Sequence, residues 1–333
     1  MNTTTLKCVL SKMLGKTVTR ADYTTTSLQG GTIGDVQLVS GIAETDSGEK
    51  LPYKVVFKTQ EKREIPGESF CREYELFKSD FGTIFSDKLR WAEYYHFEIG
   101  DKSEKNIQIW MEYIEGLTGE NLTTEMLEYI AEELGRFQGR LYKNPGILSS
   151  IDALDIGELM ERYYSQWNPE TAEYKYIRSK DCEIPSHLTQ MLIDMDNNFT
   201  EIYDNIKKLP RVLCHSDFWI NNIFYVNGTV ILIDWDYTSW GYMGEDIANL
   251  IADDIKDMKY LDEYYNIFIP AYYKGISKYF DISAIDNNYI WEMMLIKFGY
   301  RFIHRYIFAD PIESAEYKNQ QITALQKIYD IKN

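Results

Sequence analysis

The sequence predicts an α+β fold in two lobes, an N-terminal lobe built on an antiparallel sheet and a larger, mostly helical C-terminal lobe. A chain of 333 residues is long enough for about two domains. Extended segments occupy the first third, whereas apolar stripes with helical spacing dominate the remainder. We therefore expect lobes at residues 1–114 and 115–333, joined by a hinge near residues 111–116.

Residues 28–36 form a glycine-rich turn between extended segments. Gly31 and Gly34 would let backbone N–H groups approach phosphates. The β-branched and aromatic run that follows, residues 53–58, is typical of a strand. Its last residue, Lys58, stands where a strand lysine can reach nucleotide phosphates. Lys54, in the same strand, remains the alternative.

A lysine in that role needs an anionic partner, and residues 69–77 provide one. They predict the one helix of the smaller lobe, with an apolar stripe at Phe70, Tyr74 and Phe77. Glu73 lies beside this stripe and is the expected partner of Lys58. Residues 107–116 then predict a strand that enters a hydrophilic break. Backbone groups there, at Glu112 and Ile114, would bind a purine, although the pattern also fits a plain strand exit.

The most specific pattern is His215-x-Asp217-x-x-x-x-Asn222, followed twelve residues later by Asp234. This spacing suits an aspartate that orients an acceptor hydroxyl and takes its proton, and an asparagine that holds a magnesium ion. His215 is expected to support the loop by hydrogen bonding, because the aspartate already fills the role of base.

Two apolar runs between Asn222 and Asp234, separated by Asn227-Gly228, predict a β-hairpin. The hairpin would bring Asn222 and Asp234 together at its open end. A strict two-residue turn pairs Asn222 with Ile233, however, which places Asn222 and Asp234 on opposite faces. Either the turn carries a bulge, or both residues have already left strand geometry.

In this order the motifs resemble the aminoglycoside phosphotransferase and choline kinase branch of the kinase-like fold, over about residues 30–254. The resemblance implies ATP or GTP with Mg²⁺ as cofactors. It also implies that Asp217 is the catalytic base, that Asn222 and Asp234 are magnesium ligands, and that Lys58 and Glu73 clamp phosphate. Asp246, at the end of a glycine-rich stretch, would brace the catalytic loop.

The departures from protein kinases point to a small acceptor. No lysine stands two residues after Asp217, residues 234–236 read Asp-Trp-Asp, and no Ala-Pro-Glu sequence follows. The acceptor should contact the loop after Asp234 and the C-terminal helices. Candidate lining residues are Trp219, Asp236, Trp240, Tyr242, Asp253 and Asp254.

The composition limits the binding partners and the cellular location that we expect. The net charge of −17 makes nucleic acid a poor partner, and we expect none, because duplex binding depends on clustered basic residues. The same charge favours a cationic acceptor. No segment has the length of a membrane span or the apolar core of a signal peptide. The four scattered cysteines predict neither a zinc site nor a disulfide framework. We expect a cytoplasmic monomer or homodimer that needs no membrane.

An aminoglycoside-like acceptor, with a role in antibiotic resistance, is the leading hypothesis. Choline, another amino alcohol or another small metabolite is the alternative. A nucleotide-binding pseudokinase is the rival from another class, and it is disfavoured because the base, the lysine and both metal ligands are all present.

Two long helices are predicted in the larger lobe. The first carries an apolar stripe over residues 127–141 and begins after Thr123 as its N-cap. The second is expected to run without a break over residues 186–208.

Overall fold

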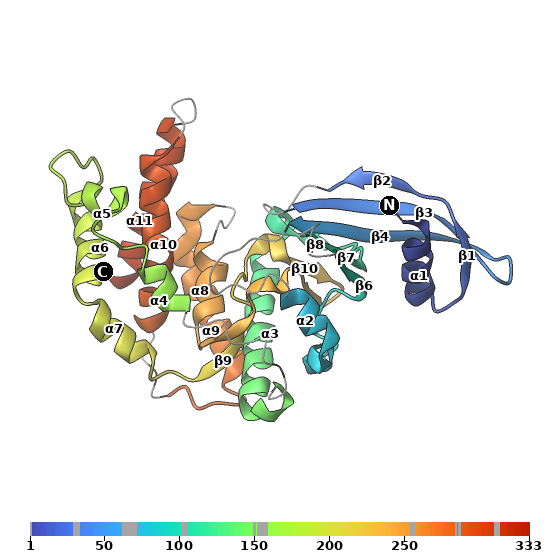
Figure 1. Cartoon of the computed structure of the whole chain (residues 1–333). Coiled ribbons are helices and arrows are strands. Elements are labelled where there is room, and N and C mark those ends of the chain that lie inside the picture. Colours follow the sequence, from blue (N-terminus) through green and yellow to red (C-terminus); the bar gives the residue numbers. More distant parts are fainter. Residues whose placement is uncertain are drawn as a thin grey trace. The chain divides into compact units, whose positions relative to one another are not determined.

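The computed structural model describes residues 2–28, 34–61, 72–100, 106–148, 151, 159–253, 257–283, 285, 288–309 and 314–333. The chain forms two compact units (Figure 1). The first comprises Met1–Gly82 and Trp91–Gly116, and the second comprises Thr83–Arg90 and Leu117–Asn333. The predicted α+β architecture is confirmed, whereas the functional lobe limits at 1–114 and 115–333 remain a proposal. Most of the glycine-rich turn, including Gly31, lies outside the described residues.

The first unit is built on an antiparallel sheet with the strand order β1-β3-β4-β7-β6, and β2 pairs with β3. The strands are β1 (Val18–Ala21), β2 (Thr24–Ser27), β3 (Gly34–Thr45), β4 (Lys50–Glu61), β6 (Tyr94–Ile99) and β7 (Asn106–Glu112). Neighbouring residues of β4 point to opposite faces, so Val55 joins one apolar cluster and Val56 another.

An N-terminal helix, which was not among the predicted elements, packs in the first cluster. Helix α1 (Thr3–Leu14) begins at Asn2, whose side chain accepts a hydrogen bond from Thr4 N, and ends at Gly15 with φ 62°. Its buried leucines pack beside Val55. Helix α2 (Arg72–Lys78) places Tyr74 and Phe77 against the second cluster. The expectation of one helix in this part of the chain was therefore wrong.

Helices make up most of the second unit. They are α3 (Thr124–Lys143), α4 (Leu159–Tyr164), α5 (Ala172–Tyr176), α6 (Ser186–Asn197), α7 (Phe199–Ile206), α8 (Glu245–Ala252), α9 (Leu261–Ile276), α10 (Asn288–Ile307) and α11 (Ser314–Lys332). The Thr123 N-cap of α3 is confirmed, since its hydroxyl accepts from Met126 N at 3.3 Å. The unbroken helix over residues 186–208 was wrong, because the chain leaves helical geometry at Asn198. No helix in the described ranges is long and apolar enough to span a membrane.

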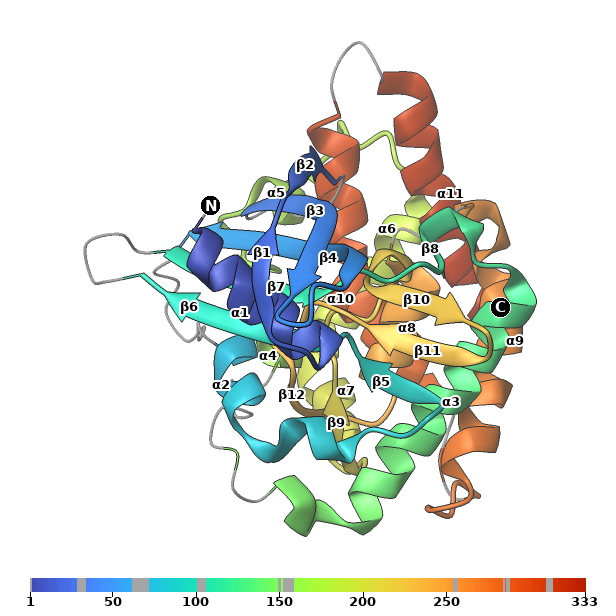
Figure 2. The same ribbon diagram turned by 90° about the vertical axis from the view of Figure 1, so that its right-hand side faces the viewer.

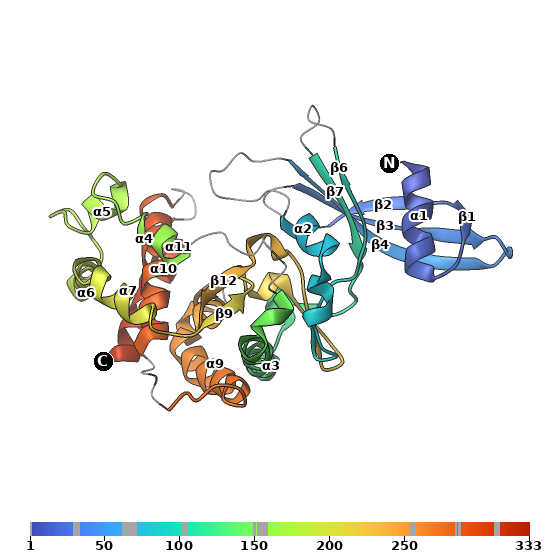
Figure 3. The same ribbon diagram turned by 60° about the horizontal axis from the view of Figure 1, so that its bottom comes forward.

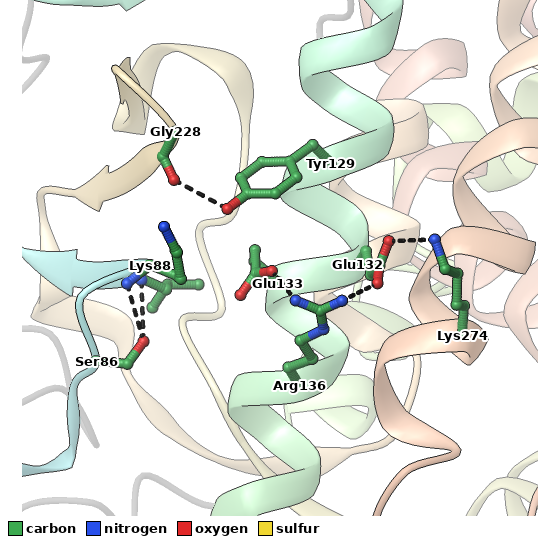
Figure 4. Close-up of polar contacts among 9 residues, drawn as sticks. Ser86, Lys88, Tyr129, Glu132, Glu133, Arg136, Gly228 and Lys274 are labelled. Atoms are coloured by element: carbon green, nitrogen blue, oxygen red, sulfur yellow. Dashed lines mark hydrogen bonds and ion pairs between the residues drawn. The ribbon is translucent and has the colours of Figure 1, made fainter.

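Helices α3 and α9 lie side by side (Figure 2 and Figure 3). Glycine permits the approach: a Cβ on Gly135 would lie 2.2 Å from Tyr272 O, and one on Gly275 would lie 2.1 Å from Glu132 O. Glu132 also accepts from Lys274 Nζ of α9 at 2.8 Å and pairs with Arg136 on its own helix (Figure 4).

Two small sheets complete the second unit. One has the order β5-β11-β10-β8, and the other pairs β9 with β12. Their strands are β5 (Leu89–Trp91), β8 (Leu117–Thr118), β9 (Arg211–Cys214), β10 (Ile223–Val226), β11 (Thr229–Leu232) and β12 (Ser239–Tyr242). The loop between β9 and β10 contains Asp217, and the β10–β11 hairpin follows this loop in the chain.

Candidate active site

The loop after β9 is held by one buried carboxylate. Asp246, in the first turn of α8, accepts hydrogen bonds from the backbone N–H groups of His215 and Ser216, each at 2.8 Å. Gln138 Nε2 of α3 donates to the same carboxylate at 2.9 Å. Ser216 has φ 68°, which non-glycine residues rarely adopt. Its backbone therefore depends on this brace, and the geometry supports the bracing role predicted for Asp246.

His215 supports the loop from the other side. The ring is buried, and its Nε2 donates to Ile233 O of the hairpin at 2.9 Å. The indole of Trp235 packs against the imidazole with ring centroids 4.5 Å apart. Burial lowers the pKa of His215, although the nearby Asp246 opposes this effect. These contacts favour a neutral, structural histidine over a proton carrier.

Asp217 and Asn222 contact each other directly. Asn222 Nδ2 donates to Asp217 Oδ2 at 2.7 Å and to Asp217 O at 3.0 Å. Burial raises the pKa of Asp217 to about 6, and the negative charge of Asp234 adds to the rise. The positive charge of Lys297 acts in the opposite direction. The loop thus presents a carboxylate whose neighbours include a second carboxylate and a cation.

The hairpin resolves the conflict over Asn222 and Asp234. Asn227 and Gly228 have φ of 48° and 85°, and the ladder pairs Ile223 with Leu232 without a bulge. Asn222 belongs to a 3₁₀ turn, Ile220–Asn222, and Asp234 has a left-handed backbone with φ 63°. The second explanation is therefore correct: both residues lie outside strand geometry, so the alternation of faces does not separate them.

The donor set at the base of the hairpin fits a hard cation. Ile233 N donates to Asn222 O at 3.1 Å, which brings the Asp234 backbone next to Asn222. Because the amide nitrogen of Asn222 faces Asp217, its Oδ1 is the atom left to coordinate an ion. An amide oxygen and a carboxylate are ligands that Mg²⁺ accepts. These residues fit the metal role predicted for them.

In the first unit, the structure pairs the expected lysine and glutamate. Lys58 Nζ lies 3.6 Å from Glu73 Oε2, with side chains 9% and 3% exposed. Tyr94 OH donates to Glu73 Oε1 at 2.7 Å and holds the carboxylate in place. Lys54 is instead half-exposed and paired with Glu115. The geometry favours Lys58 over Lys54 as the residue that contacts phosphate.

The other nucleotide candidates are less defined. Glu112 ends β7, and its backbone N–H donates to Glu93 O at 2.8 Å. The predicted contact with a purine would therefore use its carbonyl. Ile114 lies two residues after the end of β7 and is buried. Gly34 begins β3 and pairs with Gln60.

Two acceptor candidates are already engaged within the protein. Asp253 is buried and paired with Arg301 of α10. Tyr242 is also buried, and its backbone N–H donates to Glu245 Oε1 at 2.6 Å. The remaining described candidates, Trp219, Asp236 and Trp240, are half-buried, whereas Asp254 lies outside the described residues. Their roles in acceptor binding stay predictions.

Asn249 of α8 and Lys297 of α10 contact the loop after β9, and the motifs predicted neither residue. Asn249 Nδ2 donates to Ser216 O at 3.1 Å, and Asn249 Oδ1 accepts from Lys297 Nζ at 2.5 Å. One signal was present: Lys297 interrupts the apolar run Met293–Phe298, where a charge needs a reason.

Comparison with known proteins places the chain in a family. Residues 91–276 match the Phosphotransferase enzyme family. The chain belongs to this family, and the small-molecule kinase class predicted from the motifs is confirmed. None of the curated proteins matches the sequence.

Solved structures show the same fold at low identity. Choline kinase from Cryptosporidium parvum Iowa II is 18% identical with a TM-score of 0.56, over 93% of this chain and 90% of that one. Spectinomycin phosphotransferase in complex with ADP and spectinomycin is 14% identical with a TM-score of 0.53, over 100% and 99%. Amicoumacin kinase with AMP-PNP and Ca²⁺ is 15% identical with a TM-score of 0.54, over 92% and 88%. The kinase-like fold predicted from the sequence is thus confirmed.

Proposed function

We propose that the protein transfers the γ-phosphate of ATP to a hydroxyl group of a small molecule in the presence of Mg²⁺. The observation that carries this proposal is the braced loop. Its Asp217 is hydrogen-bonded to Asn222, and Asp234 follows at the base of the same hairpin. One continuous segment therefore provides a base and two oxygen ligands for a cation, which are groups that phosphoryl transfer uses.

Each residue has a distinct role in this reaction. The Asp217 carboxylate orients the acceptor hydroxyl for in-line attack on the γ-phosphorus and accepts its proton. Lys58, held by Glu73, binds nucleotide phosphate and offsets negative charge. Asn222 and Asp234 would hold Mg²⁺, which neutralises charge on the phosphate oxygens when bound.

The acceptor we favour is a cationic, aminoglycoside-like compound. The net charge of −17 supports a cation, and spectinomycin phosphotransferase shares the fold. Choline or another amino alcohol is the second candidate, since a choline kinase also shares the fold. GTP could replace ATP. In this proposal the protein acts in the cytoplasm, as a monomer or homodimer.

A coupled assay of ADP or GDP release tests the proposal. The acceptor panel comprises aminoglycosides, spectinomycin, choline, ethanolamine, amino sugars, nucleosides and methylthioribose. We expect one acceptor class to stimulate release in Mg²⁺, with the Asp217→Asn variant as the inactive control. Nucleotide binding without release for any acceptor, water included, would favour the pseudokinase instead.

A further inference from the structure

Lys297 is a buried cation beside the catalytic loop. It lies in the middle of α10 and is 5% exposed. None of the carboxylates that the structure describes lies at ion-pair distance from its Nζ. The ammonium instead meets Asn249 Oδ1 at 2.5 Å, Ser216 O at 3.5 Å and the Tyr163 ring at 4.7 Å. Burying a lysine is unfavourable unless its charge interacts with other groups, so this placement needs an explanation.

The charges around Lys297 supply part of that explanation. Asp217, Glu245 and Asp246 are acidic groups of the same region, and burial is the main cause that raises the pKa of each. The positive charge of Lys297 opposes the rise at all three. One cation therefore offsets several buried carboxyl groups without forming a close pair with any of them.

The contacts also fix one particular peptide group. Ser216 O accepts hydrogen bonds from Asn249 Nδ2 at 3.1 Å and from Lys297 Nζ at 3.5 Å. This carbonyl belongs to the peptide that joins Ser216 to Asp217. On the N-terminal side, the Asp246 carboxylate accepts hydrogen bonds from the N–H groups of His215 and Ser216. The strained backbone at Ser216 is thus clamped on both sides, directly before the proposed base.

We propose that Lys297, together with Asn249, is a positioning residue for phosphoryl transfer: the pair holds the Ser216–Asp217 peptide so that the Asp217 carboxylate points at the acceptor hydroxyl. The inference rests on the proposed function. It gives a role to a residue of α10, which lies outside the motif at residues 215–222. Lys297 acts through the peptide and does not touch the reacting atoms. Its loss should therefore reduce kcat and leave nucleotide binding nearly unchanged.

Two variants test this role in different ways. Lys297→Met keeps the length of the side chain and removes the charge. Asn249→Asp keeps an acceptor for Lys297 and removes the donor to Ser216 O, so it retains a buried pair and should fold. Lys274→Met is the matched control, because Lys274 is bonded to Glu132 and not to the loop. We expect kcat to fall about 10- to 100-fold in the first two variants, as for small errors in positioning. The control should stay within twofold.

The measurements are thermal unfolding, direct ATP binding in Mg²⁺ and steady-state ADP release with the acceptor found in the screen, or with water. A kcat for Lys297→Met within twofold of the unaltered protein would overturn the inference. A fall in ATP affinity that matches the fall in kcat would also overturn it. If Lys297→Met does not unfold cooperatively, Asn249→Asp decides by the same criteria. Absence of ADP release from the unaltered protein contradicts the proposed function itself, which separates the two failures.

Discussion

At the scale of single residues, the proposed chemistry depends on the partners that each unit gives to its charged side chains. In the first unit, Lys58 and Glu73 are both buried and form an ion pair, and the Tyr94 hydroxyl donates a hydrogen bond to the Glu73 carboxylate. In the second unit, Asp217 has an amide partner in Asn222 and a more distant cation in Lys297. The motif spacing predicted roles for Asp217 and Lys58, whereas a lysine within the apolar run Met293–Phe298 does not by itself show which loop it contacts.

The two lysines of β4 give a matched pair of variants. Lys58→Met should raise the KM for ATP about 10- to 100-fold, because hydrogen bonds to charged groups contribute about 1.5–3 kcal/mol. Lys54→Met removes a lysine from the same strand that is exposed and paired with Glu115. It should leave KM and kcat within twofold. Equal effects of the two substitutions on steady-state kinetics would contradict the assignment of Lys58.

At the scale of elements, the β10–β11 hairpin is held at its tip as well as at its base. Tyr129 OH of α3 donates to Gly228 O at 2.9 Å (Figure 4), and Thr229 Oγ1 donates to Asp87 O at 3.0 Å. Val230 N donates to Lys88 O at 2.8 Å. These contacts hold the hairpin against α3 and against the segment that contains Asp87 and Lys88, and the proposed metal ligands lie at the other end of the hairpin.

The hairpin turn makes a prediction about stability. Gly228 has φ 85°, and a Cβ there would meet no atom within 4 Å, so Gly228→Ala strains only the backbone. We expect the free energy of unfolding to fall by about 1–2 kcal/mol, the usual penalty for a left-handed L-residue. Gly146→Ala is the control, because that glycine is equally open but lacks a positive φ. Urea unfolding of both variants measures the difference, and equal midpoints would refute the turn geometry.

The helices and strands also show which elements local sequence can predict. Asn227-Gly228 and the Thr123 cap predicted the hairpin and α3 correctly, because turns and caps depend on neighbouring residues. The break at Asn198 was missed, since the apolar stripe continues across it. Helix α1 had the available signals of an Asn2 cap and a Gly15 end.

At the scale of the whole molecule, the family and the fold define a small-molecule kinase, while the acceptor is set by a few side chains. The predicted cationic acceptor rests on a net charge of −17, which is a property of the whole chain and not of the site. The charges that act on Asp217 include Asp253, which is paired with Arg301, and the buried Lys297. The sequence could predict the reaction because its motifs are contiguous. It could not predict the acceptor, because the described candidate residues lie in separate segments: the loop after β9, the turn after Asp234, strand β12 and the end of α8.

The metal requirement is testable on the intact protein. Asp234→Ala should leave a cooperatively folded protein that no longer turns over, because one of two proposed ligands is lost. ATP binding by this variant should also gain little from Mg²⁺. Calorimetric titration of ATP with and without Mg²⁺ measures this dependence. Near-normal phosphotransfer by Asp234→Ala would show that the cation is held elsewhere.

The most direct test of the central claim is a comparison of turnover and nucleotide binding in Asp217→Asn. The substitution keeps the shape of the side chain and removes its charge, so the loss should fall on the chemical step. At saturating ATP and Mg²⁺ we expect kcat to fall about 10²- to 10⁴-fold, as for loss of a general base, while the Kd for ATP changes only a few-fold. Impaired ATP binding with intact turnover at saturation would instead make Asp217 a structural or metal-site residue, and the assignment of the catalytic loop would be wrong.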